Sequence, residues 1–175
     1  MSDFPSPLVL PDPLVTITLS SMCSLGAVAY PAIASAAWPT ANKALFIPFK
    51  LTRPITATQM FVYNGTTAQD NFDLGIYSVD GTRLVSAGAT VQANASVIQV
   101  VNITDTLLGP GLFYMACAFE GTTSTVIRTT LTASKGKIAG ITEMANAYPL
   151  PAVATFATLT TSVLPIIGLT TRSVV

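Results

Sequence analysis

Few side chains in this sequence are able to do chemistry. Its 175 residues include no histidine, eight lysines and arginines, and eight aspartates and glutamates. Without histidine the chain lacks the general base of Ser-His-Asp and Cys-His systems, and also the main nitrogen ligand of zinc sites. Carboxylates are what remains, and the only close group of them is Asp70, Asp73 and Asp80.

Two chemical roles are open to these carboxylates. A pair of them can hydrolyse a glycosidic bond, and the run Asp70-Asn71-Phe72-Asp73 offers oxygen ligands to calcium. Against both roles, Asp73 falls on the polar face of an expected strand and Asp80 belongs to an Asp-Gly turn. We therefore expect all three to be solvated surface residues. We predict that the chain is not an enzyme and holds no metal or cofactor.

The overall composition favours burial against other proteins. Charged residues make up 9% of the chain, hydrophobic residues 50%, and the net charge is zero. An average domain carries about 25% charged residues. Nothing here resembles a basic footprint, so we do not expect a nucleic-acid partner. A neutral, weakly charged surface promotes association, and we expect the chain to live in an assembly.

Little in the sequence supports export, membrane insertion or disulfide bonding. The opening Met1-Ser2-Asp3-Phe4-Pro5 lacks the basic region of a signal peptide. The apolar stretch 22–37 is interrupted by Pro31, and it is shorter than the roughly 20 residues that span a bilayer. Two cysteines cannot form a disulfide framework. Cys117 lies in a strand-like run and is expected in the core, with a single bridge to Cys23 as the alternative.

The N-terminal quarter differs from the rest. Four prolines among the first 13 residues favour extended chain, and residues 14–19 alternate as a half-buried strand does. We predict an extended N-terminal arm and apolar attachment segment over residues 1–43, and a body over residues 44–175. Trp38 has two interpretations, as a plug at one end of the body or as an anchor at a subunit contact. The candidate partner-interface residues are Phe4, Leu8, Leu10, Val15, Ile17, Tyr30 and Trp38.

The body is predicted to be all β. Its residues are rich in threonine, valine and isoleucine, which suit a pleated surface, and turn signals such as Asn64-Gly65 and Gly109-Pro110-Gly111 separate the runs. A helical turn over 139–147 and a closing strand within 155–167 complete the expectation. Strands at this spacing indicate a single antiparallel β-sandwich. The predicted strands are 44–50, 56–63, 72–79, 82–87, 97–103, 112–119 and 125–131.

The sharpest local prediction is a hairpin at Asp80-Gly81. Asp-Gly favours a type I′ turn, because both of its central residues take positive φ. A two-residue loop sets Val79 opposite Thr82, and it also sets Ile76 opposite Val85 and Leu74 opposite Ala87. One face of the hairpin is then apolar and the other, with Asp73, Gly75 and Tyr77, is the polar face.

Several of these runs together resemble a known class of protein. They are Phe61-Val62-Tyr63-Asn64-Gly65, Asn71-Phe72-Asp73-Leu74-Gly75-Ile76-Tyr77 and Asp80-Gly81-Thr82-Arg83-Leu84-Val85-Ser86-Ala87-Gly88, with Ala44-Leu45-Phe46-Ile47-Pro48-Phe49 before them and Leu112-Phe113-Tyr114-Met115-Ala116 after them. The chain resembles small jelly-roll-like β-sandwich virion proteins of tailed bacteriophages, over roughly residues 44–131.

The resemblance implies a function that needs no catalytic group. It implies a capsid decoration (cement) protein, a homotrimer on the capsid surface that binds between capsomers of the major capsid protein and stabilises the shell by mass action. Such a protein is made in the host cytoplasm. The alternative is a tail or head fibre module that recognises a host surface glycan, with sugar stacking on Trp38 or Tyr77 as one expectation.

Overall fold

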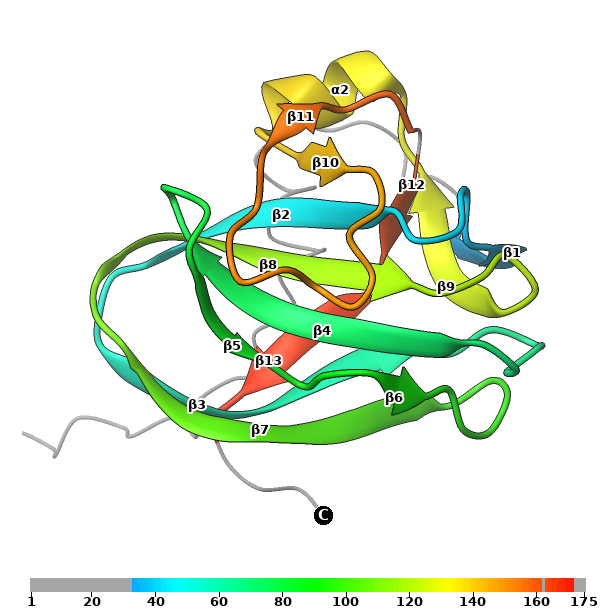
Figure 1. The fold of residues 1–175 in the computed structure, drawn as a ribbon, viewed down its shortest axis with the longest axis horizontal. Coiled ribbons are helices and arrows are strands. Elements are labelled where there is room, and N and C mark those ends of the chain that lie inside the picture. Colours follow the sequence, from blue (N-terminus) through cyan, green and yellow to red (C-terminus); the bar gives the residue numbers. More distant parts are fainter. Residues whose placement is uncertain (1–32, 162, 172–175) are drawn as a thin grey trace, which may run out of the picture.

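The computed structural model describes residues 33–161 and 163–171. The predicted strand of residues 14–19, and all of the arm before residue 33, lie outside the described residues. Within the described residues, short strands and one short helix follow one another along the chain (Figure 1). They are β1 Ile33–Ala37, β2 Ala44–Leu51, β3 Ile55–Tyr63, β4 Asn71–Ser78, β5 Arg83–Ser86, β6 Thr90–Val91, β7 Ile98–Leu108, β8 Gly111–Phe119, β9 Thr125–Thr130, α2 Ala133–Ile138, β10 Thr142–Met144, β11 Ala157–Thr158, β12 Val163–Pro165 and β13 Ile167–Thr170.

The strands form three antiparallel sheets. The large sheet has the order β11-β10-β2-β8-β4-β5, with β6 also paired to β4. A second sheet, β13-β3-β7, packs against one face of it, and a third, β1-β9-β12, lies at one side (Figure 1). All ten strand pairings are antiparallel. The prediction of an all-β antiparallel sandwich is confirmed, and the seven predicted body strands match β2, β3, β4, β5, β7, β8 and β9.

The main core lies between the large sheet and the second sheet. Along β2, Leu45, Ile47 and Phe49 point into it, because successive strand residues face opposite ways. They meet Met60 and Val62 of β3 there. Burying each such side chain fully contributes about 1.5–3 kcal/mol. The alternation of β2 and β3 therefore holds the two sheets face to face.

The outer face of the large sheet is covered as well. The segment 145–156, which crosses in front of β8 and β4 in Figure 1, lays Leu150 and Phe156 on Phe46 and Tyr77. Phe46 meets both rings edge-on, with centroids 5.2 Å from Tyr77 and 5.1 Å from Phe156. Small alanines of β2 and β8 share this cluster and leave room for the segment. The large sheet is thus buried on both faces.

The segment 145–156, which we call the covering segment, lies on the face of the hairpin that was predicted to be polar and exposed. Asp73 and Tyr77 are fully buried rather than solvated. The phenol of Tyr77 donates a hydrogen bond of 2.6 Å to the carbonyl of Pro151 in the covering segment. The predicted alternation of side chains along β4 is confirmed. Both faces of β4, however, pack against other parts of the chain, so its polar face is buried.

The hairpin forms where it was predicted, with a different turn. Ile76 pairs with Val85 as expected, yet Ser78 N donates to Thr82 O across a three-residue loop. Of the loop residues only Gly81 has positive φ, at 87°, so the turn is not type I′. Leu84 is the extra residue of a bulge between the pairs Ile76–Val85 and Tyr77–Arg83, which restores the register.

The C-terminal part of the body departs further from expectation. The predicted helical turn over 139–147 is wrong, because the helix spans Ala133–Ile138 and the chain then enters β10. Thr132 caps the helix through its hydroxyl, which accepts from Lys135 N at 3.3 Å, and Gly140 turns the chain away with φ of 76°. The predicted closing strand within 155–167 is divided among three short strands, β11, β12 and the start of β13.

Candidate functional site

The three carboxylates singled out by the sequence lie at three different points along β4 and its turn. Asp70 precedes β4 and accepts from Ser124 N at 2.7 Å. Asp80 sits in the β4–β5 turn and accepts from Thr82 N at 3.3 Å and from the hydroxyl of Thr82 at 3.2 Å. Within residues 33–161 and 163–171, no three acidic or cysteine side chains gather as metal ligands do. Each of the three carboxylates has a structural partner in the chain.

Asp73 occupies the most unusual place of the three. Its carboxylate is fully buried and accepts from the hydroxyl of Ser86, at 2.9 and 3.0 Å to its two oxygens, and from Leu150 N at 3.0 Å. Burial raises the pKa of Asp73, and these hydrogen bonds oppose the rise only in part. The expectation of a solvated Asp73 is wrong, since the strand edge and the covering segment close over it.

A shallow polar groove opens beside Asp73, where the edge strand β5 meets the edge strand β7. It has a volume of about 540 Å³. One wall comes from β5 and the residues after it, and the other from the middle of β7. We call it the edge groove. The residues that define it are Asp73, Arg83, Leu84, Ser86, Thr104 and Thr106.

Arg83 supplies the cation of the edge groove. Its guanidinium donates to the carbonyl of Leu150, and its main-chain N–H donates to Ala152 O at 2.9 Å. No carboxylate in the described residues lies within 4.0 Å of it, although Asp73 is near enough to attract it electrostatically. An arginine has five N–H donors, so most of those on Arg83 remain available to a ligand.

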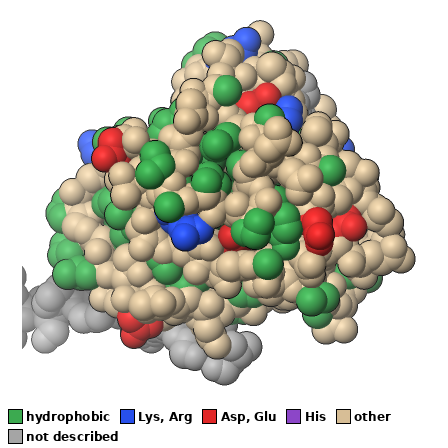
Figure 2. Space-filling view, viewed as in Figure 1, with side chains coloured by type: hydrophobic (Ala, Val, Ile, Leu, Met, Phe, Trp, Pro, Cys, Tyr) green, Lys and Arg blue, Asp and Glu red, His purple; other side chains and the backbone are tan. Residues whose placement is uncertain are grey.

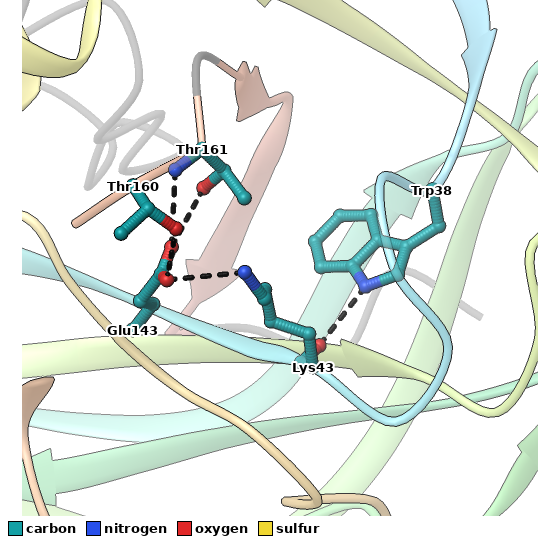
Figure 3. Close-up of polar contacts among 5 residues, drawn as sticks. All are labelled: Trp38, Lys43, Glu143, Thr160 and Thr161. Carbon is teal, nitrogen blue, oxygen red and sulfur yellow. Dashed lines mark hydrogen bonds and ion pairs between the residues drawn. The ribbon is translucent and has the colours of Figure 1, made fainter.

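A second polar cluster lies toward the opposite edge of the large sheet, at β10 and the start of β2, and it is nearly closed to solvent (Figure 3). Lys43 Nζ stands 3.0 Å from Glu143 Oε1, and both side chains are nearly buried. Glu143 also accepts from the hydroxyl of Thr160 at 2.6 Å, and from the hydroxyl and main-chain N–H of Thr161 at 3.0 and 3.1 Å. We call these four residues the Lys43–Glu143 cluster. It ties β10 to the start of β2 and to the chain before β12.

The Lys43–Glu143 cluster is structural rather than catalytic. Burial alone raises the pKa of Glu143, but the hydrogen bonds from Thr160, Lys43 and Thr161 outweigh it and lower the pKa to about 2. Both carboxylate oxygens are thus occupied by donors of the same chain. A general acid or base needs a free oxygen and a pKa near the working pH, and Glu143 has neither.

Trp38 lies in the core next to this cluster. It is 1% exposed, its ring packs on Phe119 with centroids 4.9 Å apart, and its Nε1 donates to Lys43 O at 2.9 Å. The structure places it as a plug, the first of its two interpretations. Sugar stacking on Trp38 or Tyr77 is excluded in this fold, since both rings are buried. The other candidate interface residues lie outside the described residues: Phe4, Leu8, Leu10, Val15, Ile17 and Tyr30.

Sequence reasoning did not find the edge groove. Its two walls lie about two strands apart in the chain, and Arg83, Thr104 and Thr106 look like ordinary strand residues. β5 and β7 end two different sheets, and only the packing of those sheets against each other brings the two walls together.

Comparisons of the chain with protein-family models, curated proteins and solved structures found no match. In the part of the chain that the structure describes, no helix has the length and apolarity needed to cross a bilayer.

Proposed function

We propose that the chain is a structural protein of a virion, a capsid decoration (cement) protein that binds between capsomers of the major capsid protein as a homo-oligomer, most simply a trimer. The observation that carries the proposal is the internal use of its acidic groups. Of the six acidic side chains in the described residues, five accept hydrogen bonds from the chain itself: Asp70, Asp73, Asp80, Glu120 and Glu143. Most acidic side chains of the described residues therefore serve the fold itself.

What the surface offers instead is apolar. Several large hydrophobic side chains on or near the β4–β5 and β7–β8 turns are exposed, and Leu107 among them is 74% exposed. Ser78 pairs with Phe113, which brings the β4–β5 and β7–β8 turns to the same end of the large sheet. On the face shown in Figure 2, charged side chains are few and scattered among neutral and hydrophobic ones. The exposed apolar residues of this end are Val79, Leu84, Leu107, Leu112 and Val153.

Such a surface suits permanent burial against protein neighbours. Contiguous exposed apolar groups mark interaction sites, and a protein that binds the assembled shell better than its separate subunits stabilises the shell by mass action. The choice of a phage shell as the partner rests on the sequence resemblance. The exposed apolar end and the apolar arm are what would make the contact.

The test is binding of the purified chain to empty shells of the major capsid protein encoded with it. We expect the full chain to co-sediment with shells and to raise their melting temperature. Deletion of residues 2–19 should lower the bound fraction at least about tenfold, since it removes the proline-rich first part of the arm. The melting temperature of the deletion variant shows whether the body still folds. Equal binding by both chains would contradict the role proposed for the arm. No binding by the full chain would contradict the shell as the binding partner.

One observation favours the second candidate, a fibre module that recognises a host glycan. A small polar ligand needs a concave site with a few convergent hydrogen-bonding groups. The edge groove has that character, with Arg83 and the hydroxyls of Ser86, Thr104 and Thr106 around it. Binding to host cells in the absence of any shell would favour this candidate over the first.

A further inference from the structure

We propose that the edge groove is a binding site for a saccharide that carries a carboxylate. The proposal stands on the groove itself and does not require that the chain bind a shell. It gives the glycan-binding alternative a definite place and a definite ligand chemistry.

The charge of the groove selects an anion. Arg83 is its cation, and no carboxylate of the described residues pairs with it within 4.0 Å. The one acidic side chain in the lining, Asp73, is fully buried and already accepts from Ser86 and Leu150. A ligand therefore meets the guanidinium fork first. A carboxylate matches that fork with two parallel hydrogen bonds.

The walls select a hydroxylated ligand. Thr104 is exposed and its hydroxyl makes no hydrogen bond within the described residues, so it is available as both donor and acceptor. The hydroxyl of Thr106 donates to Thr104 O at 2.7 Å and keeps its lone pairs free. Leu84, 41% exposed at the bulge, offers an apolar surface to the C–H face of a sugar ring. A cation, free hydroxyls and one apolar side chain are what an acidic sugar needs.

The backbone around the groove argues against a peptide strand as the ligand. Strand addition needs a regular edge with its N–H and C=O groups in phase. The β4–β5 pairing shifts register between Ile76 and Tyr77, and the β3–β7 pairing shifts between Ala57 and Gln59, opposite the Thr104 region. Both edges are therefore irregular beside the groove. A single cation also suits one carboxylate better than a row of phosphates.

The wall that follows β5 allows close approach at Gly88. A Cβ built on Gly88, which has φ of 73°, would meet nothing within 4 Å. The groove volume of about 540 Å³ lies in the range of small-molecule sites. Because the groove is shallow, we expect a dissociation constant on the order of 0.1–1 mM for a single acidic sugar unit.

The experiment is an amide chemical-shift titration of the full isotope-labelled chain with sialyllactose, with digalacturonate and, as the neutral counterpart, with lactose. We expect both acidic saccharides to shift the amides of Ser86, Gly88, Thr104 and Thr106, and lactose to shift them at least about tenfold more weakly. Shifts of equal size with lactose would overturn the carboxylate part of the proposal.

The matched variants are Thr104→Asp and Thr130→Asp. Both add one negative charge at an exposed threonine of a strand, but only Thr104 lies in the groove. We expect Thr104→Asp to weaken sialyllactose binding at least about tenfold by repulsion, and Thr130→Asp to leave it unchanged. Arg83→Lys keeps the charge and loses the fork, so roughly a threefold to tenfold loss is expected.

Three outcomes would overturn the proposal. The first is no shift with either acidic saccharide up to about 10 mM, well above the expected dissociation constant. The second is a set of shifts that map away from the groove. The third is tighter binding of an acidic peptide than of sialyllactose in the groove, which would assign the groove to a protein partner. Shell binding is measured separately, so failure here leaves the decoration proposal standing, and the reverse also holds.

Discussion

Substitution of Glu143 by glutamine should remove a large electrostatic contribution to the stability of the fold. The carboxylate accepts from Lys43, Thr160 and Thr161, and its pKa is about 2 against an ordinary 4.5. The difference, 4.5 − 2 = 2.5 pH units, corresponds to about 3 kcal/mol of stability at neutral pH, at about 1.4 kcal/mol per unit. Glu143→Gln also leaves Lys43 nearly buried without a counter-charge, which adds to the cost.

The sign of the pH dependence follows from the lowered pKa. A carboxyl whose pKa is depressed by folding stabilises the fold above its unfolded pKa, and this contribution is lost as the pH falls from 4.5 to about 2. Asp73 has a raised pKa and works in the opposite sense, favouring the fold as the pH falls. Wild type and variant share Asp73, so its effect cancels when the two are compared at the same pH.

The assay is urea unfolding of wild type and Glu143→Gln at several pH values between about 7 and 2.5. We expect wild type to be more stable by about 3 kcal/mol near pH 7, with the gap narrowing as the pH falls. Glu120→Gln is the matched control, because that exposed carboxylate accepts a hydrogen bond only from Asn71. Its effect should stay within about 0.5 kcal/mol. Equal stability of wild type and Glu143→Gln at pH 7, or a gap that persists into acid, would refute the reasoning.

Three further predictions concern the backbone at Gly81, the hydrogen bond of Tyr77 and the reactivity of Cys117. Gly81→Ala should cost about 2 kcal/mol or more of unfolding free energy, since it combines positive φ with a Cβ placed 2.4 Å from Ala154 O. Gly88→Ala, also at positive φ but in open space, should cost only about 1 kcal/mol of unfolding free energy. If both variants lost the same amount, the close contact of residue 81 with the covering segment would make no contribution to the loss. Tyr77→Phe should lose about 1 kcal/mol, measured in the same way, because it deletes the bond to Pro151 O. In a Cys23→Ser variant the native chain should not react with a thiol reagent, because Cys117 is buried and burial raises its pKa; prompt labelling would contradict this placement.

Local pattern predicted the strands of the body well. Alternation and β-branched residues placed β2, β3, β4 and β8 within one or two residues of their observed ends. The turn chemistry was predicted only in part. Asp80 engages Thr82 and Ser78 through its side chain, and the loop then needs positive φ at Gly81 alone, which favours three residues over two.

What the pattern did not predict depends on contacts between distant parts of the chain. The covering segment has no periodic hydrophobicity. No pattern therefore predicts that Leu150 and Phe156 bury the outer face of the large sheet, or that Asp73 is buried with it. Nothing in the sequence distinguishes Glu143 from the other seven acidic residues, and only the pairing of β10 with β2 brings it to Lys43. The edge groove likewise follows from the packing of two sheets, which brings the edge strands β5 and β7 together.

The central claim, that the chain acts by burial against the subunits of a shell, is tested most directly by electron cryomicroscopy. Shells assembled from the major capsid protein encoded with this chain would be imaged with and without the purified full chain. We expect added density at the junctions between capsomers, into which the sandwich fits. Shells with no added density in a saturating excess of the folded chain would contradict it.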